Sequence, residues 1–105
     1  MQKPITLTAD NFQEEVINSS IPVLVDFWAQ WCPPCRMLAP TLDRLAQDIG
    51  DSGKVGKIDI DKYPDLATQY GVMSVPTLIA LKDGKIIAKA VGVRPLPELK
   101  KMLGV

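Results

Sequence analysis

The chain has 105 residues, the length of one ordinary domain, and 47% of them are apolar and 23% charged, as in typical globular proteins. Twelve Lys and Arg balance twelve Asp and Glu, so charge gives no reason to expect binding to nucleic acid or to an anionic membrane. The chain has no histidine and only two cysteines, which excludes Ser-His-Asp triads, His-ligated metals, four-cysteine zinc sites and iron–sulfur clusters within one chain. Any chemistry must therefore use thiols, carboxylates, lysines or hydroxyls.

The N-terminal segment shows no basic region followed by an apolar stretch, as a signal peptide would. The longest apolar run, residues 78–81, is far shorter than the ~20 residues of a membrane span. We therefore expect a soluble cytoplasmic protein whose thiols are mostly reduced. No linker, repeat or low-complexity stretch divides the chain, so we expect residues 1–105 to form a single domain.

The first third of the chain predicts a strand, a helix and a second strand. Residues 5–7 form a short strand candidate, and either Thr8 or Asp10 can cap a helix that runs to about Asn18. Residues 22–29 are apolar on both alternating faces, which predicts a strand buried on both sides, as in a parallel sheet.

The middle of the chain continues this alternation. A helix is predicted from about Cys35 to Ile49, because its leucines recur on one stripe and a glycine follows it. Pro40 lies inside this helix and should kink it, since proline removes a donor and clashes with the preceding turn. Residues 55–60 are read as a strand, and residues 64–70 as a short helix that starts at a proline.

The last third predicts two strands and a helix. Residues 76–82 and 85–91 are the strands, and the Asp83-Gly84 pair between them is a strong hairpin signal. The final helix starts near Leu96 and turns its leucines inward. This order of crossover units followed by a hairpin predicts an α/β fold, with a mixed central sheet and helices on both faces.

Residues 31–35 read Trp-Cys-Pro-Pro-Cys at the junction of a predicted strand and helix. A purely structural disulfide is one interpretation, but closing so short a loop stabilises by only ~2 kcal/mol. A second interpretation is that the two cysteines are half of a metal site. Only carboxylates or a second protomer could supply the remaining ligands. The third is a redox-active dithiol, which we favour because an i, i+3 spacing at a helix start suits a disulfide.

In that third interpretation the two cysteines have different roles. Cys32 faces unpaired backbone N–H groups and the positive end of the helix dipole, and both favour the thiolate. We therefore expect Cys32 to be the exposed, low-pKa nucleophile. We expect Cys35, one turn inside the helix, to be the resolving thiol.

Three stretches of the chain resemble the thioredoxin family over essentially the whole length. They are VLVDFWAQWCPPCRMLAP (residues 23–40), KIDIDKYPDLATQYGVMSVPTLIALKDGK (residues 57–85) and VGVRP (residues 91–95). The resemblance implies the thioredoxin fold, in which a five-stranded mixed sheet is flanked by four α-helices. It also implies a general thiol–disulfide oxidoreductase that reduces client proteins, needs no metal or organic cofactor, and is recharged by an NADPH- or ferredoxin-dependent reductase. We expect it to act as a monomer.

The resemblance also gives roles to polar residues whose sequence context leaves two interpretations open. Asp26, in the middle of an apolar strand, is either satisfied by local hydrogen bonds or is a desolvated acid–base group for Cys35. The matching family residue has the second role. Lys57, on the neighbouring strand, either modulates Asp26 by proximity or extends to the surface.

The resemblance further implies a flat apolar groove for substrate around Cys32. Pro76 matches the cis-proline of the family, although a bare proline here could simply begin a strand. Trp28 is expected to pack beneath the site. The expected substrate-binding residues are Trp31, Pro33, Pro34, Val75, Pro76 and Gly92.

One residue departs from the family pattern, which usually has Gly-Pro between the cysteines. Pro33 removes a backbone N–H near Cys32 and stiffens the loop, so we expect a changed reduction potential. The sequence leaves the direction of that change open. It also leaves two alternative functions: a thiol oxidant or isomerase on the same fold, and a binding module whose cysteines are incidental.

Overall fold

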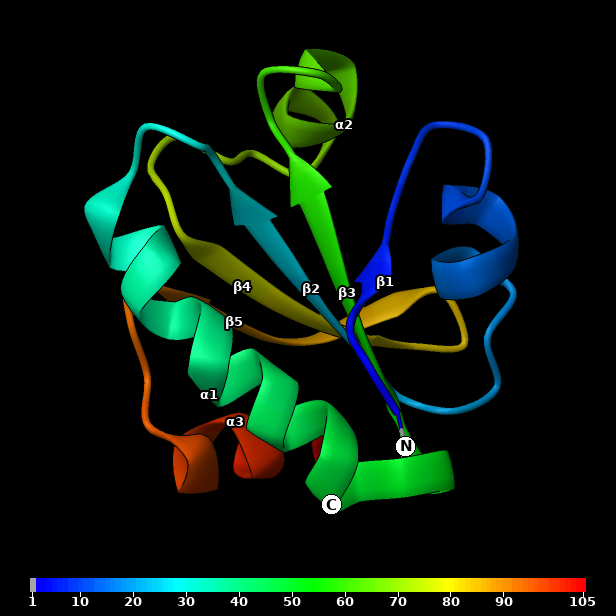
Figure 1. Cartoon of the computed structure of the whole chain (residues 1–105). Helices are drawn as coiled ribbons and strands as arrows, with labels where there is room; N and C mark the ends of the chain where they lie inside the picture. Colours follow the sequence, from blue (N-terminus) through cyan, green and yellow to red (C-terminus); the bar gives the residue numbers. More distant parts are fainter. Residues whose placement is uncertain (1) are drawn as a thin grey trace.

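The computed structural model describes residues 2–105, and within them one sheet has five strands in the order β1-β3-β2-β4-β5 (Figure 1). The strands are β1 (Ile5–Thr6), β2 (Val23–Trp28), β3 (Lys54–Asp59), β4 (Thr77–Lys82) and β5 (Lys85–Val91). β3 pairs in parallel with β1 and β2, whereas β4 runs antiparallel to both β2 and β5. The predicted mixed sheet is therefore confirmed, including a hairpin whose Asp83 and Gly84 both have positive φ.

Four predicted helices are present within residues 2–105, together with a short 3-10 turn. They are η1 (Gln13–Ile17), α1 (Pro33–Ile49), α2 (Pro64–Gln69) and α3 (Leu96–Leu103), and the 3-10 turn is η2 (Gly50–Ser52). The first helix is shorter than predicted and is a π-helical turn, closed by a bond from the Asn18 N–H to the Gln13 carbonyl of 2.9 Å. Thr8 caps the turn that precedes η1. Its hydroxyl oxygen accepts a hydrogen bond from the Asn11 N–H at 3.2 Å.

The long helix α1 begins at Pro33, two residues before the predicted start at Cys35. Prolines suit the first positions of a helix, where their missing N–H groups would have no partner within the helix. The helix continues through Pro40, which is exposed, and ends at Gly50, whose φ is +51°.

No helix within residues 2–105 is long and apolar enough to cross a membrane.

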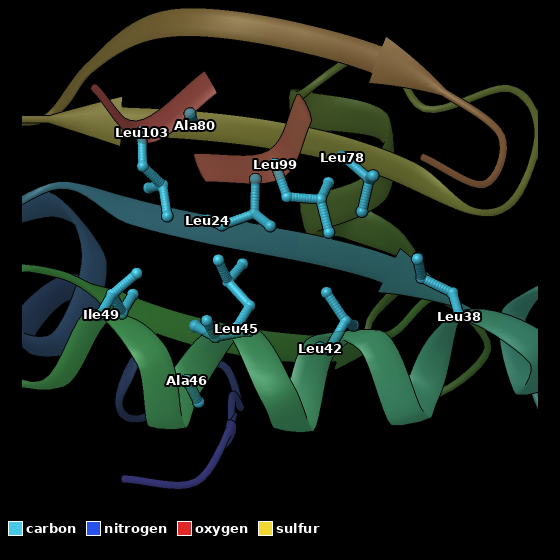
Figure 2. Packing of buried hydrophobic residues seen from close by; sticks show 11 residues of the cluster. Leu24, Leu38, Leu42, Leu45, Ala46, Ile49, Leu78, Ala80, Leu99 and Leu103 are labelled. Atoms are coloured by element: carbon cyan, nitrogen blue, oxygen red, sulfur yellow. The ribbon is translucent and has the colours of Figure 1, made fainter. Parts of the chain in front are cut away.

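Two apolar clusters cover the two faces of the sheet. On one face Leu24 of β2 packs with residues from α1 and α3, and Leu42 and Leu45 of α1 point toward it (Figure 2). On the other face Val25 and Phe27 of β2 pack with residues from η1 and α2. The prediction that this strand is buried on both sides is confirmed, and the burial removes a large apolar area from water.

Successive side chains of β2 point to opposite faces of the sheet, and this alternation also places one carboxylate inside the protein. Asp26 shares the face of Leu24, which is the side covered by α1, and is paired in register with Lys57 of β3 and Leu78 of β4. β2 then ends at Trp28, and only four residues separate it from the start of α1. The fold thus brings a buried acid and the N-terminus of a long helix to the same end of the sheet.

Candidate active site

The two cysteines form a disulfide at the N-terminus of α1, with their Cα atoms 5.3 Å apart. Cys32 is the N-cap residue, in an extended conformation, and its N–H donates to the Ala29 carbonyl at 3.3 Å. Cys35 lies in the first turn of the helix and faces the core. The short turn after β2 therefore determines where the helix begins. The spacing of the two cysteines then brings their sulfurs close enough to form a disulfide.

The sulfur of Cys32 accepts a hydrogen bond from the backbone N–H of Cys35 at 3.2 Å. Pro33 and Pro34 fill the first two helical positions and have no N–H, so the amide of Cys35 is the first helical donor available to this sulfur. An amide donor and the positive helix end both favour a negative charge on Cys32 once the disulfide is reduced. The two sulfurs are thus electrostatically unequal.

Exposure, in contrast, does not distinguish the two cysteines. Each is only 3% exposed, so the expectation that Cys32 is the exposed thiol is wrong for this disulfide form. Ala29 shares a buried cluster with the pair, Trp28 packs against it, and the Val75 carbonyl oxygen lies 3.7 Å from the Cys32 sulfur. These neighbours account for the burial of Cys32.

Asp26 is 1% exposed, and neither of its carboxylate oxygens has a hydrogen-bond partner within residues 2–105. The interpretation that local hydrogen bonds satisfy this carboxylate is therefore wrong. Desolvation by burial raises the pKa of Asp26 to about 7, and the positive charge of Lys57 opposes that rise. Asp26 thus changes charge near neutral pH, which makes it a candidate proton-transfer group.

Lys57 is partly buried beside Asp26 rather than fully extended into solvent. Its ammonium nitrogen lies 5.0 Å from the centre of the Trp28 ring, in a cation–π arrangement. Lys57 and Trp28 also line a cavity of about 330 Å³ together with Asp59. Lys57 is therefore close to Asp26 and also partly accessible to solvent. Trp28 packs against the disulfide, as expected.

The Val75–Pro76 bond is cis, as the family resemblance implies, and it lies against the disulfide. The Gly92 N–H donates to the Pro76 carbonyl at 2.8 Å, which joins the end of β5 to this loop. Gly92 has a φ of +95°, a conformation that residues with a side chain rarely adopt. The structure therefore places Val75 against Cys32 and joins Gly92 to the adjacent Pro76.

Trp31 is 64% exposed beside the disulfide, and its indole N–H donates to the Asp61 carboxylate at 2.9 Å. Pro33 and Pro34 are also exposed on this surface. Sequence reasoning missed Asp61, and it missed Arg36, whose guanidinium donates to the Gln30 carbonyl at 2.7 Å. The Trp31–Asp61 contact joins residues 30 positions apart, so no local sequence pattern indicates it.

A family model described as Thioredoxin matches residues 3–104. The chain belongs to the thioredoxin family. It is 48% identical to Thioredoxin 1 of Synechococcus elongatus over 98% of this chain and 96% of that protein. It is also 49% identical to Thioredoxin of Bacillus subtilis over 94% of this chain and 93% of that protein. With Thioredoxin of Griffithsia pacifica the identity is 52%, over 81% and 78% of the two chains.

Membership in this family, together with the cysteine pair, establishes the activity of the chain. It is a thiol–disulfide oxidoreductase that interacts with a reductase and with client proteins. Members of the thioredoxin family need no metal or organic cofactor. Within residues 2–105, no group of three or more His, Cys, Asp or Glu side chains is placed to hold a metal ion.

The raised pKa of Asp26 predicts how stability depends on pH. Below pH 3.8 the carboxyl is protonated in both the folded and the unfolded protein. As the pH rises to about 7, the unfolded state ionises while the folded state retains its proton, so the free energy of unfolding falls. The loss reaches up to about 4 kcal/mol and is complete above the folded-state pKa.

Asn cannot ionise, so we expect the free energy of unfolding of the Asp26→Asn variant not to show this decrease with pH. Urea unfolding of the disulfide form across this pH range measures the difference between variant and wild type. Asp43→Asn, which removes an exposed carboxylate from α1, controls for the change in net charge. Parallel stability profiles for the Asp26→Asn variant and the wild type would contradict the assignment.

Proposed function

We propose that Cys32 is the nucleophile and Cys35 the resolving thiol in the reduction of client disulfides. The observation that carries this assignment is the hydrogen bond from the Cys35 N–H to the Cys32 sulfur at the N-terminus of α1. The Cys32 thiolate attacks one sulfur of the client disulfide, and the other client sulfur leaves as a thiolate. The product of this step is a mixed disulfide between Cys32 and the client.

The second step restores the internal disulfide and releases the client. Cys35 loses its proton and attacks the Cys32 sulfur, and the client sulfur leaves with the electron pair of the mixed disulfide bond. The client has then gained two electrons, and Cys32 and Cys35 have lost them. A reductase supplies two electrons to the Cys32–Cys35 disulfide to begin another cycle.

Asp26 is proposed as the base that accepts the Cys35 proton. It lies on the face of β2 that α1 covers, and Cys35 is on the buried side of α1. A base is most effective when its pKa is close to the working pH, and burial brings Asp26 to about 7. Lys57 is proposed to tune this group, because its charge favours the ionised carboxylate.

The client segment is proposed to bind in extended form against the cis-proline loop. Within residues 2–105, the Val75 N–H donates to no acceptor, which leaves it available to a client backbone carbonyl. Exposed apolar side chains near this loop, Trp31 and Val93, suit contact with many different proteins. The proposed contact residues are Trp31, Pro33, Pro34, Val75, Pro76 and Gly92.

The finer features of partners and setting are also proposals. We propose that the reductase depends on NADPH or ferredoxin, and that the protein works as a monomer in the cytoplasm. We propose further that residues 1–105 act as a single domain, which is supported by a family match over residues 3–104.

Removal of the resolving thiol should trap the mixed disulfide. We expect Cys35→Ser, mixed with a protein that carries an accessible disulfide, to accumulate a covalent adduct through Cys32, because no second thiol can release the client. Non-reducing electrophoresis with and without dithiothreitol measures the adduct.

Cys32→Ser is the matched control, and it should form no adduct of comparable yield. Equal adduct formation through Cys35 would contradict the assignment of roles. If no adduct forms while non-covalent partners survive Cys32→Ser, the chain acts as a binding module instead.

Replacement of Pro33 tests how the loop sets the reduction potential. We expect Pro33→Gly to raise the potential, because a restored N–H stabilises the Cys32 thiolate and a looser loop disfavours the closed disulfide. The rise should be roughly 30 mV, since this corresponds to about 1.4 kcal/mol for a two-electron couple.

Titration against glutathione buffers measures the midpoint of each variant. Pro40→Ala removes an exposed proline from the same helix without altering the dithiol loop, so its midpoint should match that of the wild type. Equal midpoints for the Pro33→Gly variant and the wild type would show that the loop prolines do not control the potential.

A further inference from the structure

Arg94 lies at the edge of the surface that surrounds the disulfide. A series of short contacts links the two: the Cys32 sulfur lies 3.7 Å from the Val75 carbonyl, and the Pro76 carbonyl accepts from Gly92 at 2.8 Å. A Cβ atom placed on Gly92 would lie 3.5 Å from Nη1 of Arg94. The segment from β5 to α3 descends on the side of the molecule where α1 begins (Figure 1).

The charge of Arg94 is only weakly neutralised by its own chain. Its Nε lies 3.4 Å from a carboxylate oxygen of Glu98, and the two side chains are 32% and 50% exposed. Its Nη1 also donates to the adjacent Val93 carbonyl at 3.1 Å. A guanidinium has five N–H donors, so these two contacts leave donors free for a further acceptor. An exposed ion pair of this kind is easily exchanged for another.

The opposite side of the surface has a different arrangement. There the Asp61 carboxylate is already engaged by the indole N–H of Trp31, and the exposed polar side chains of Gln30 and Lys62 lie beside it. A client carboxylate that reaches the Gly92 side therefore meets a guanidinium with free donors. Arg favours carboxylates because its planar fork matches both of their oxygens.

We propose that Arg94 is a specificity residue that favours client disulfides with an acidic side chain close to the attacked cysteine. The carboxylate of the client replaces Glu98 as the partner of the guanidinium while the client lies against the cis-proline loop. This inference rests on the proposed function, because it requires that clients bind on this surface during attack by Cys32. The preference is local, since the chain as a whole has no net charge.

Pairs of disulfide peptides that differ only by Glu or Gln, at positions on either side of the attacked cysteine, test this proposal. The measurement is the rate of reduction of each peptide by the reduced protein, divided by the rate for dithiothreitol to remove intrinsic reactivity. For at least one position, we expect the wild type to prefer the Glu peptide about two- to fivefold, the range of an exposed ion pair. High salt should reduce this ratio.

Arg94→Gln should bring the Glu-to-Gln ratio close to one, and Arg94→Lys should retain part of the preference because it keeps the charge and loses the fork. Glu98→Gln should increase the ratio, since it removes the competing carboxylate. Lys101→Gln, which removes a charge from the last turn of α3, is the matched control and should leave the ratio unchanged.

An unchanged ratio in the Arg94→Gln variant would overturn the proposal, as would a wild-type protein that shows no preference at any position. An equal decrease in the Lys101→Gln variant would also overturn it, because overall charge would then explain the effect. Reduction of neither peptide by the wild type, while dithiothreitol reduces both, would instead contradict the proposed function itself.

Discussion

The site depends on one hydrogen bond, from the Cys35 N–H to the Cys32 sulfur, at the point where the chain enters α1. Cys32 is held at the N-cap because β2 ends four residues before the helix begins. The same connection places Cys35 one turn inside, against the core. A difference between two chemically identical thiols therefore arises from their positions relative to one helix terminus, rather than from exposure, which is the same for both.

The buried carboxylate is the second essential constraint, and it opposes stability. Asp26 occupies a core position between Leu24 and the end of β2, and its carboxylate has no hydrogen bond within residues 2–105 to compensate for its burial. A structural role would favour an apolar residue or a satisfied amide at that position. An ionisable group at this position makes sense if it takes part in proton transfer. The pKa of about 7 allows Asp26 to gain and lose its proton near neutral pH.

Much of this arrangement could be predicted from the sequence, because it follows from local patterns. The strands, the hairpin at Asp83 and the long helix are set by apolar periodicity and turn residues. The π-helical turn η1 differs from the longer predicted helix, since i→i+5 bonding leaves no distinct sequence pattern. Cys32 is buried although the sequence predicts an exposed thiol, because the loop at Val75 covers its sulfur. The contact between Trp31 and Asp61 depends on how two distant loops meet, which residue order alone does not determine.

We propose that the N-terminus of α1 makes Cys32 the ionised thiol of the pair. The pH dependence of alkylation in the reduced protein, with each cysteine followed by mass spectrometry, tests it most directly. We expect Cys32 to react first, with a midpoint well below the value of about 8.5 of an ordinary thiol, while Cys35 stays largely unmodified. A midpoint of about 8.5 or higher for Cys32, or equal reactivity of both cysteines, would contradict the account.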